Sequence, residues 1–141
     1  MKTKVINFGI EGRTTHVTTQ TKYGTFYGKV TCADEDLDVQ NELDGYIFAE
    51  TKCNIQAYKR RAKFLEQRAI GIKHAYNVLK NSGISVDDPV MKKLNRQVKI
   101  AQREAEIANR LYQAFKANFK HLVEASIKTR RKIKEMNKDK N

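Results

Sequence analysis

The stretch YGTFYGKVTCADEDLD, residues 23–38, begins as an alternating pattern and ends in a run of acidic residues. The even-numbered residues from Phe26 to Cys32 share one face of an extended chain, and the odd-numbered residues share the other. Lys22-Tyr23-Gly24 is a turn candidate before it, because glycine adopts positive φ without a steric penalty. The stretch predicts a half-buried β-strand that leads directly into a differently structured, acidic segment.

Two further strands are predicted upstream of this stretch. KVINFGI, residues 4–10, alternates with Ile6, Phe8 and Ile10 on one side, and Glu11-Gly12 follows as a turn. TTHVTTQ, residues 14–20, is rich in the β-branched residues that favour a pleated surface. The three segments predict an antiparallel β-meander with one apolar face, which must pack against another element to be stable.

The rest of the chain has helical periodicity. The acidic residues at 34–36 indicate a helix start, and from Leu43 to Leu79 apolar or small residues recur at steps of four and three, with Gly45 as a possible break. Asn81-Ser82-Gly83 ends this helix, and Asp87-Asp88-Pro89 begins a second one with the same spacing from Met91 to Met136. We therefore expect an antiparallel, coiled-coil-like helical hairpin.

The fold class predicted is α+β, with an N-terminal three-stranded antiparallel β-meander packed on this long helical hairpin. We expect a single domain over residues 1–141. Its segments are the meander at 1–33, a first helical segment at 34–83, a second long helix at 87–136 and a frayed basic tail at 137–141.

The net charge of +12 is distributed unevenly. Residues 1–50 contain 5 Lys and Arg and 8 Asp and Glu, a net −3, whereas residues 51–141 contain 23 and 8, a net +15. This balance indicates either an anionic partner or a strongly solvated helical surface. We expect no membrane span and no signal peptide, and two reduced thiols, Cys32 and Cys53, in a cytosolic protein.

A second apolar stripe lies off the predicted helix seam. It comprises Ile55, Phe64, Ile70 and Val78 on the first helix and Ile100, Ile107, Leu111 and Ala114 on the second. A two-helix hairpin alone leaves such residues in water, so we expect a homodimer or a higher homo-oligomer. The alternative is that the β-meander covers the whole stripe.

The sequence contains no recognisable catalytic or metal-binding motif. The P-loop, GxGxxG, GxSxG and HExxH patterns are absent, and the three histidines are isolated. The opening spacing of Asp34, Asp36 and Asp38 is that of an EF-hand, but Val39 and Gly45 occupy the positions of its required Gly and Glu. We therefore predict no catalytic residue, no metal, no cofactor and no enzymatic activity.

Arginines next to aromatic residues are the chemical feature that remains. Tyr58, Arg60 and Arg61 lie in the first helix, and Arg110 lies in the second. In a hairpin that turns near residue 85, positions whose numbers sum to about 170 are level, which places Arg60 opposite Arg110. Arginine binds phosphate through paired hydrogen bonds, and aromatic rings stack on bases. The alternative is that these arginines lie on a solvated face.

The chain resembles the Thoeris anti-defence family of phage proteins. The resemblance rests on residues 23–36, which carry an F-x-G-x-x-x-C-x-x-E-D pattern, on NELDG at 41–45, and on IFAE at 47–50. Phe48 occupies a position where the family motif has a smaller residue. Proteins of this family have a β-meander followed by two long helices, and they bind cyclic ADP-ribose isomers in the bacterial host cytoplasm without cleaving them.

The resemblance implies a ligand site where two protomers meet. It implies phosphate-binding roles for Arg60 and Arg110 and a ribose- or base-reading role for Asn95, with Tyr58, Arg61 and Arg96 as further ligand-binding candidates. His74 and Lys29 are candidates for a second site that binds cyclic oligonucleotides.

Three other functions are compatible with the residues. The first is a basic coiled-coil adaptor or structural phage protein, which would bind a partner through the off-seam stripe. The second is non-specific nucleic-acid binding, although Glu66, Glu104, Glu106 and Glu124 interrupt the basic run. The third is an enzyme without a recognisable motif.

Overall fold

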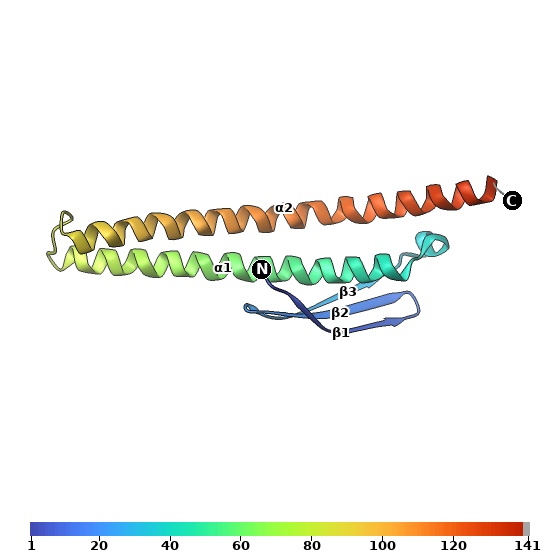
Figure 1. The fold of residues 1–141 in the computed structure, drawn as a ribbon, viewed down its shortest axis with the longest axis horizontal. Coiled ribbons are helices and arrows are strands. Elements are labelled where there is room, and N and C mark those ends of the chain that lie inside the picture. Colours follow the sequence, from blue (N-terminus) through green and yellow to red (C-terminus); the bar gives the residue numbers. More distant parts are fainter. Residues whose placement is uncertain (140–141) are drawn as a thin grey trace. The chain divides into compact units, whose positions relative to one another are not determined.

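A computed structural model describes residues 1–139 of the chain and confirms the α+β architecture (Figure 1). The elements are β1 (Lys4–Glu11), β2 (Thr14–Thr21), β3 (Gly24–Thr31), the 3-10 helix η1 (Asp34–Val39), α1 (Glu42–Asn81) and α2 (Pro89–Asp139). The chain divides into two compact units. We call residues 1–57 with 114–139 the sheet unit, and residues 58–113 the hairpin unit.

In the sheet unit, the three strands form an antiparallel sheet in the order β1-β2-β3. Val17 at the centre of β2 pairs with Phe8 of β1 and Gly28 of β3. The register of β1 shifts between Val5 and Asn7, so the strict alternation predicted for β1 fails at Ile6. The turns fall at Gly12-Arg13 and Lys22-Tyr23, where the sequence predicts them, and Gly12 and Gly24 both have positive φ.

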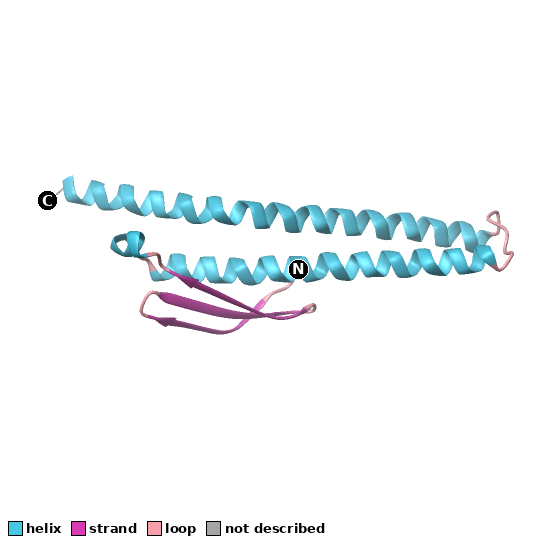
Figure 2. Cartoon of the chain, turned by 180° about the vertical axis from the view of Figure 1, so that it is seen from behind, coloured by secondary structure: helices cyan, strands magenta, loops and turns pink. Residues whose placement is uncertain are grey.

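The sheet packs against one side of the first turns of α1, and α2 lies along the other side of this part of α1 (Figure 2). The core consists of Val17 and Phe26 from the sheet and Ala49, Cys53 and Ala57 from the helix. The helical residues are spaced by four and are small, so they form a shallow face on which the strands lie closely.

The acidic segment at 34–39 does not continue into the long helix. The predicted helical segment at 34–83 is therefore two separate helices. The acidic segment forms η1, and α1 begins separately at Glu42. The side chain of Asn41 accepts a hydrogen bond from the Asp44 amide at 3.0 Å, which caps the new helix. Gly45 does not break the helix: a Cβ there would lie 2.6 Å from the Thr15 hydroxyl oxygen, so it permits close approach of β2.

The acidic segment binds the last part of α2 instead. Arg131 donates to Asp36 at 2.8 Å, to Asp38 at 3.1 Å and to the backbone carbonyl of Glu35 at 2.8 Å. Lys134 donates to Asp38 at 3.0 Å. We call this set the acidic clasp. It attaches α2 to η1 through charge-assisted hydrogen bonds across more than ninety residues of sequence.

In the hairpin unit, the predicted seam is confirmed. Its buried residues are Ala62 and Ala69 of α1 and Met91, Val98, Ala101, Ala108 and Tyr112 of α2. Gly83 follows the end of α1 with a positive φ, and Asp88 accepts a hydrogen bond from the Val90 amide at 2.9 Å ahead of Pro89. The connection is therefore the predicted stop and N-cap.

The predicted seam is wrong at the start of α1. Leu43 and Ile47 are 61% and 42% exposed, and Phe48 contacts α2 in their place, with its ring centre 6.5 Å from that of Phe119. At the other end, α2 remains helical to Asp139, so residues 137–139 of the predicted frayed tail are helical. Residues 140 and 141 lie outside the described part of the chain.

Candidate functional site

The hairpin unit carries most of the surplus positive charge. Residues 58–113 contain 13 Lys and Arg and 5 Asp and Glu, a net +8. All the predicted ligand-binding residues except Lys29 lie in this unit. A helical surface with this balance attracts anions, and the attraction strengthens where the charges converge.

The ion pair between Arg68 and Glu104 shows which residues of α1 and α2 lie at the same level of the hairpin. Their side chains approach to 3.8 Å, and their numbers sum to 172, close to the predicted 170. Arg60 is therefore level with residue 112, and at about 1.5 Å per residue Arg110 lies roughly 3 Å along the axis from that level. The prediction that Arg60 and Arg110 share one level of the hairpin is consistent with this register.

The two arginines do not face one another within one chain. Arg60 is two positions from the seam residue Ala62, and Arg110 is two positions from Tyr112, which is also in the seam. Two positions rotate a helical side chain by about 200°, away from the partner helix. Both residues are exposed, so they lie on opposite outer faces of the hairpin.

The other candidates are spread along the unit. Tyr58, Arg61 and Asn95 are half-buried, and Arg96 and His74 are exposed. Asn95 lies 15 residues before Arg110 on α2, which is about 22 Å along the helix. One small nucleotide therefore cannot contact Asn95 and Arg110 of the same chain. Lys29 lies exposed on β3 in the sheet unit, where its backbone carbonyl accepts a hydrogen bond from Lys52.

A groove of about 950 Å³ runs along one side of the hairpin unit. It is lined by Lys59, Ala62, Lys63, Glu66, Gln67, Ala69, Ile70, Lys73, Gln102, Ala105, Glu106, Asn109 and Tyr112. None of the predicted binding residues lines this groove. It is lined by three lysines and two glutamates, so its charge balance also favours an anion.

Comparisons with known proteins assign this chain to no family. No protein-family model, no curated protein and no solved structure matches this chain. The assignments of Arg60, Arg110, Asn95, Tyr58, Arg61, Arg96, His74 and Lys29 therefore stay predictions.

The sequence reasoning missed the polar contacts of the sheet unit. Arg130 forms a bidentate ion pair with Asp44, in which its Nε and Nη2 donate to the two carboxylate oxygens at 2.9 and 3.0 Å. The acidic clasp lies beside this pair. The signal available in the sequence was the complementarity of DEDLD at 34–38 and TRRK at 129–132. Local capping rules explain the acidic residues equally well, so only the three-dimensional contacts distinguish the two interpretations.

Within residues 1–139, no helix is both long enough and apolar enough to cross a membrane.

Proposed function

We propose that this protein sequesters a cyclic nucleotide immune signal, of the cyclic ADP-ribose class, without cleaving it. In this proposal it acts in the cytoplasm of an infected bacterial host as a phage anti-defence protein, and it blocks activation of the host Thoeris effector. The observation that carries the proposal is the net +8 hairpin unit with arginines at one level on its two outer faces. The resemblance of residues 23–50 to the Thoeris anti-defence family supplies the ligand class.

A complete site in this proposal requires two copies of the chain. Arg60 and Arg110 of one chain lie on opposite outer faces, and Asn95 is about 22 Å from Arg110, so no ligand joins all three within one copy. The outer faces also carry apolar residues that a second copy would cover. Ile100 and Ile107 on α2 are 58% and 52% exposed, and Phe64 and Val78 on α1 are similarly exposed. Burying such residues favours association.

The expected binding free energy is compatible with sequestration of a signalling nucleotide. Competition with a receptor requires nanomolar binding, or about −12 kcal/mol. Arginine–phosphate hydrogen bonds contribute about 1.5–3 kcal/mol each, and a base stacked on an aromatic ring such as Tyr58 adds about 1 kcal/mol. Long preformed helices keep the entropic cost of ordering the site low.

The first test is calorimetric titration with a cyclic ADP-ribose isomer, with recovery of the ligand afterwards. We expect tight binding to a dimer or larger oligomer, intact ligand on recovery, and a loss of at least about tenfold in affinity for Arg60→Ala and for Arg110→Ala. Lys128→Ala, which removes an exposed positive charge from the sheet unit, should bind as the wild type does. Wild-type affinity in both arginine variants would refute the assigned site.

Subunit mixing tests whether two copies share the site. If Arg60 comes from one copy and Arg110 from the other, a mixed dimer of the two variants contains one intact site. An equimolar, fully exchanged mixture then recovers about a quarter of the wild-type sites. If both arginines come from the same copy, mixing restores nothing.

Non-specific nucleic-acid binding is the second candidate that the +8 charge favours. It predicts a thermal shift with duplex DNA that disappears as salt is raised, and no shift with the cyclic nucleotide. No shift with either class of ligand would instead favour the adaptor function.

A further inference from the structure

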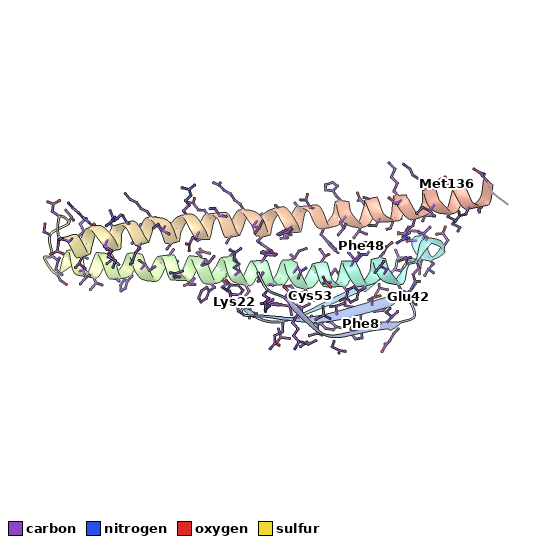
Figure 3. The ribbon with its side chains drawn as sticks, in the orientation of Figure 1. Phe8, Lys22, Glu42, Phe48, Cys53 and Met136 are labelled. Atoms are coloured by element: carbon purple, nitrogen blue, oxygen red, sulfur yellow. The ribbon has the colours of Figure 1, made fainter. Side chains whose placement is uncertain are left out.

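The sheet unit contains a partly open, largely apolar cavity that lies outside the residues proposed to bind the nucleotide. Its volume is about 260 Å³, equal to roughly nine water molecules in the liquid. Apolar walls come from Val30 of β3, Phe48 of α1, and Phe119, Val123 and Ile127 of α2. In Figure 3, Phe48 extends from α1 toward α2, whereas Cys53 points to the sheet on the other side. The cavity therefore extends along the α2 side of α1, and it adjoins the core at Val30, which lines the cavity and packs against the core residues.

The cations around this cavity differ in how they are neutralised. Arg13 forms an ion pair with Asp34, and Arg130 forms its bidentate ion pair with Asp44. Lys52 forms no ion pair with a carboxylate among residues 1–139. The ammonium group of Lys52 is therefore the uncompensated charge on the cavity wall.

The position of Lys52 suits an anion that enters beside an aromatic ring. Its Nζ donates one hydrogen bond to the Lys29 carbonyl at 2.9 Å and lies 5.9 Å from the centre of the Phe119 ring. An ammonium group has three donors, so two remain for a ligand. The Phe119 and Phe48 rings, in edge-to-face contact, continue the apolar surface from that point.

The acidic residues at the cavity do not compete for this position. Asp36 is bound by Arg131 at 2.8 Å. Glu42 is exposed and lies ten residues before Lys52, about 15 Å along α1. A carboxylate beside Lys52 therefore lies at the end of the cavity away from Glu42.

We propose that this cavity binds a small monocarboxylate with an apolar or aromatic body, its carboxylate on Lys52 and its body between Phe48, Phe119 and Val123. The charge lies at one end of an apolar cavity, which is the arrangement that orients an amphipathic anion. The proposal does not depend on the nucleotide site, since none of its residues belongs to the hairpin unit.

The test uses 4-phenylbutyrate as the probe and its neutral analogue 4-phenylbutanamide as the matched ligand. Titration of the full chain, followed by amide chemical shifts in NMR spectra, reports both affinity and location. We expect phenylbutyrate to bind at least about tenfold more tightly than the amide, with shifts at Phe48 and Phe119. Lys52→Met should remove the preference for the carboxylate, and Lys52→Arg should keep it.

Two further variants make the result decisive. Val123→Phe fills the cavity and should abolish binding of both ligands. It does not alter Lys52, so it still tests the cavity if Lys52→Met fails to fold. Arg60→Ala lies in the hairpin unit and should bind phenylbutyrate as the wild type does. The proposal is overturned if phenylbutyrate does not bind, if it binds no better than the amide, or if Val123→Phe leaves its binding unchanged.

Discussion

Gly28 is the position where the contact between sheet and helix is most sensitive to added volume. It lies buried in β3, opposite Val17, with no side chain of its own. A Cβ at this position would lie 3.0 Å from the Sγ of Cys53 and 3.1 Å from the carbonyl carbon of Ala49, and closer still to the Ala49 carbonyl oxygen. The atoms in the way belong mainly to the backbone of α1, which cannot rotate aside as a flexible side chain can.

Gly28→Ala should therefore destabilise the protein strongly. Overpacking a core costs about 1–3 kcal/mol, and a backbone obstacle places this variant at the upper end, near 3 kcal/mol. At roughly 4 °C per kcal/mol for a chain of this size, the melting temperature should fall by about 12 °C.

Gly71→Ala is the matched control, because it adds the same methyl group in open space. No heavy atom lies within 4 Å of a Cβ at Gly71, which is exposed in the interior of α1. Replacing a helical glycine by alanine should stabilise the protein by about 0.5–1 kcal/mol. Urea unfolding followed by circular dichroism measures both variants. A Gly28→Ala protein within about 0.5 kcal/mol of the wild type would refute the close approach of β3 to α1.

Three further predictions concern the acidic clasp and the thiols. Arg131→Ala should lower the urea midpoint at low salt, and 1 M NaCl should reduce the difference from the wild type, since salt screens exposed pairs. The hydrogen bond from Lys134, helped by Arg131, holds the pKa of Asp38 below its ordinary 3.8. A depressed carboxylate pKa stabilises the fold above about pH 4 and loses this effect as pH falls through the folded pKa, so Lys134→Met should flatten the acid limb of stability between pH 5 and pH 2. Burial raises the pKa of both thiols, and Cys53 is fully buried whereas Cys32 is partly exposed. At pH 8 a disulfide reagent should therefore titrate Cys32 in the native protein and Cys53 only after unfolding, and two equally fast thiols would contradict the packing of Cys53.

The β-meander and the hairpin connection could be predicted from the sequence because local rules determine them. Turn glycines at 12 and 24 and the Gly83-to-Pro89 signal each act within a few residues. The seam of the hairpin unit was equally predictable, because α1 and α2 bury one stripe each and the stripe repeats at heptad spacing.

The first part of α1 could not be predicted in the same way because two partners share it. The sheet takes the face of Ala49, Cys53 and Ala57, and α2 takes the face of Phe48. Hydrophobic periodicity alone selects the larger residues Leu43 and Ile47, which are exposed. Small residues that permit close packing have little apolar signal, so the sheet-binding face was not visible before the strands were placed.

The separation of charge between the two units gives the acidic run a physical role. Arginines near the end of α2 would add to the basic surface of the chain if they were unpaired. The acidic clasp and the Asp44–Arg130 pair engage them within the sheet unit, and no residue of the hairpin unit takes part in these pairs. Residues 1–57 together with 114–141 have a net charge of only +4, against +8 for the hairpin unit, out of the total of +12. The Asp44–Arg130 pair is bidentate and half-buried, and the acidic clasp is a network, so both also contribute to stability. We infer that they additionally restrict strong anion attraction to the hairpin unit. Reversing the charge of Asp38 and Asp44 should therefore weaken the preference of an anionic ligand for the hairpin unit. NMR mapping of a polyphosphate probe on the wild type and on this variant would measure that preference directly.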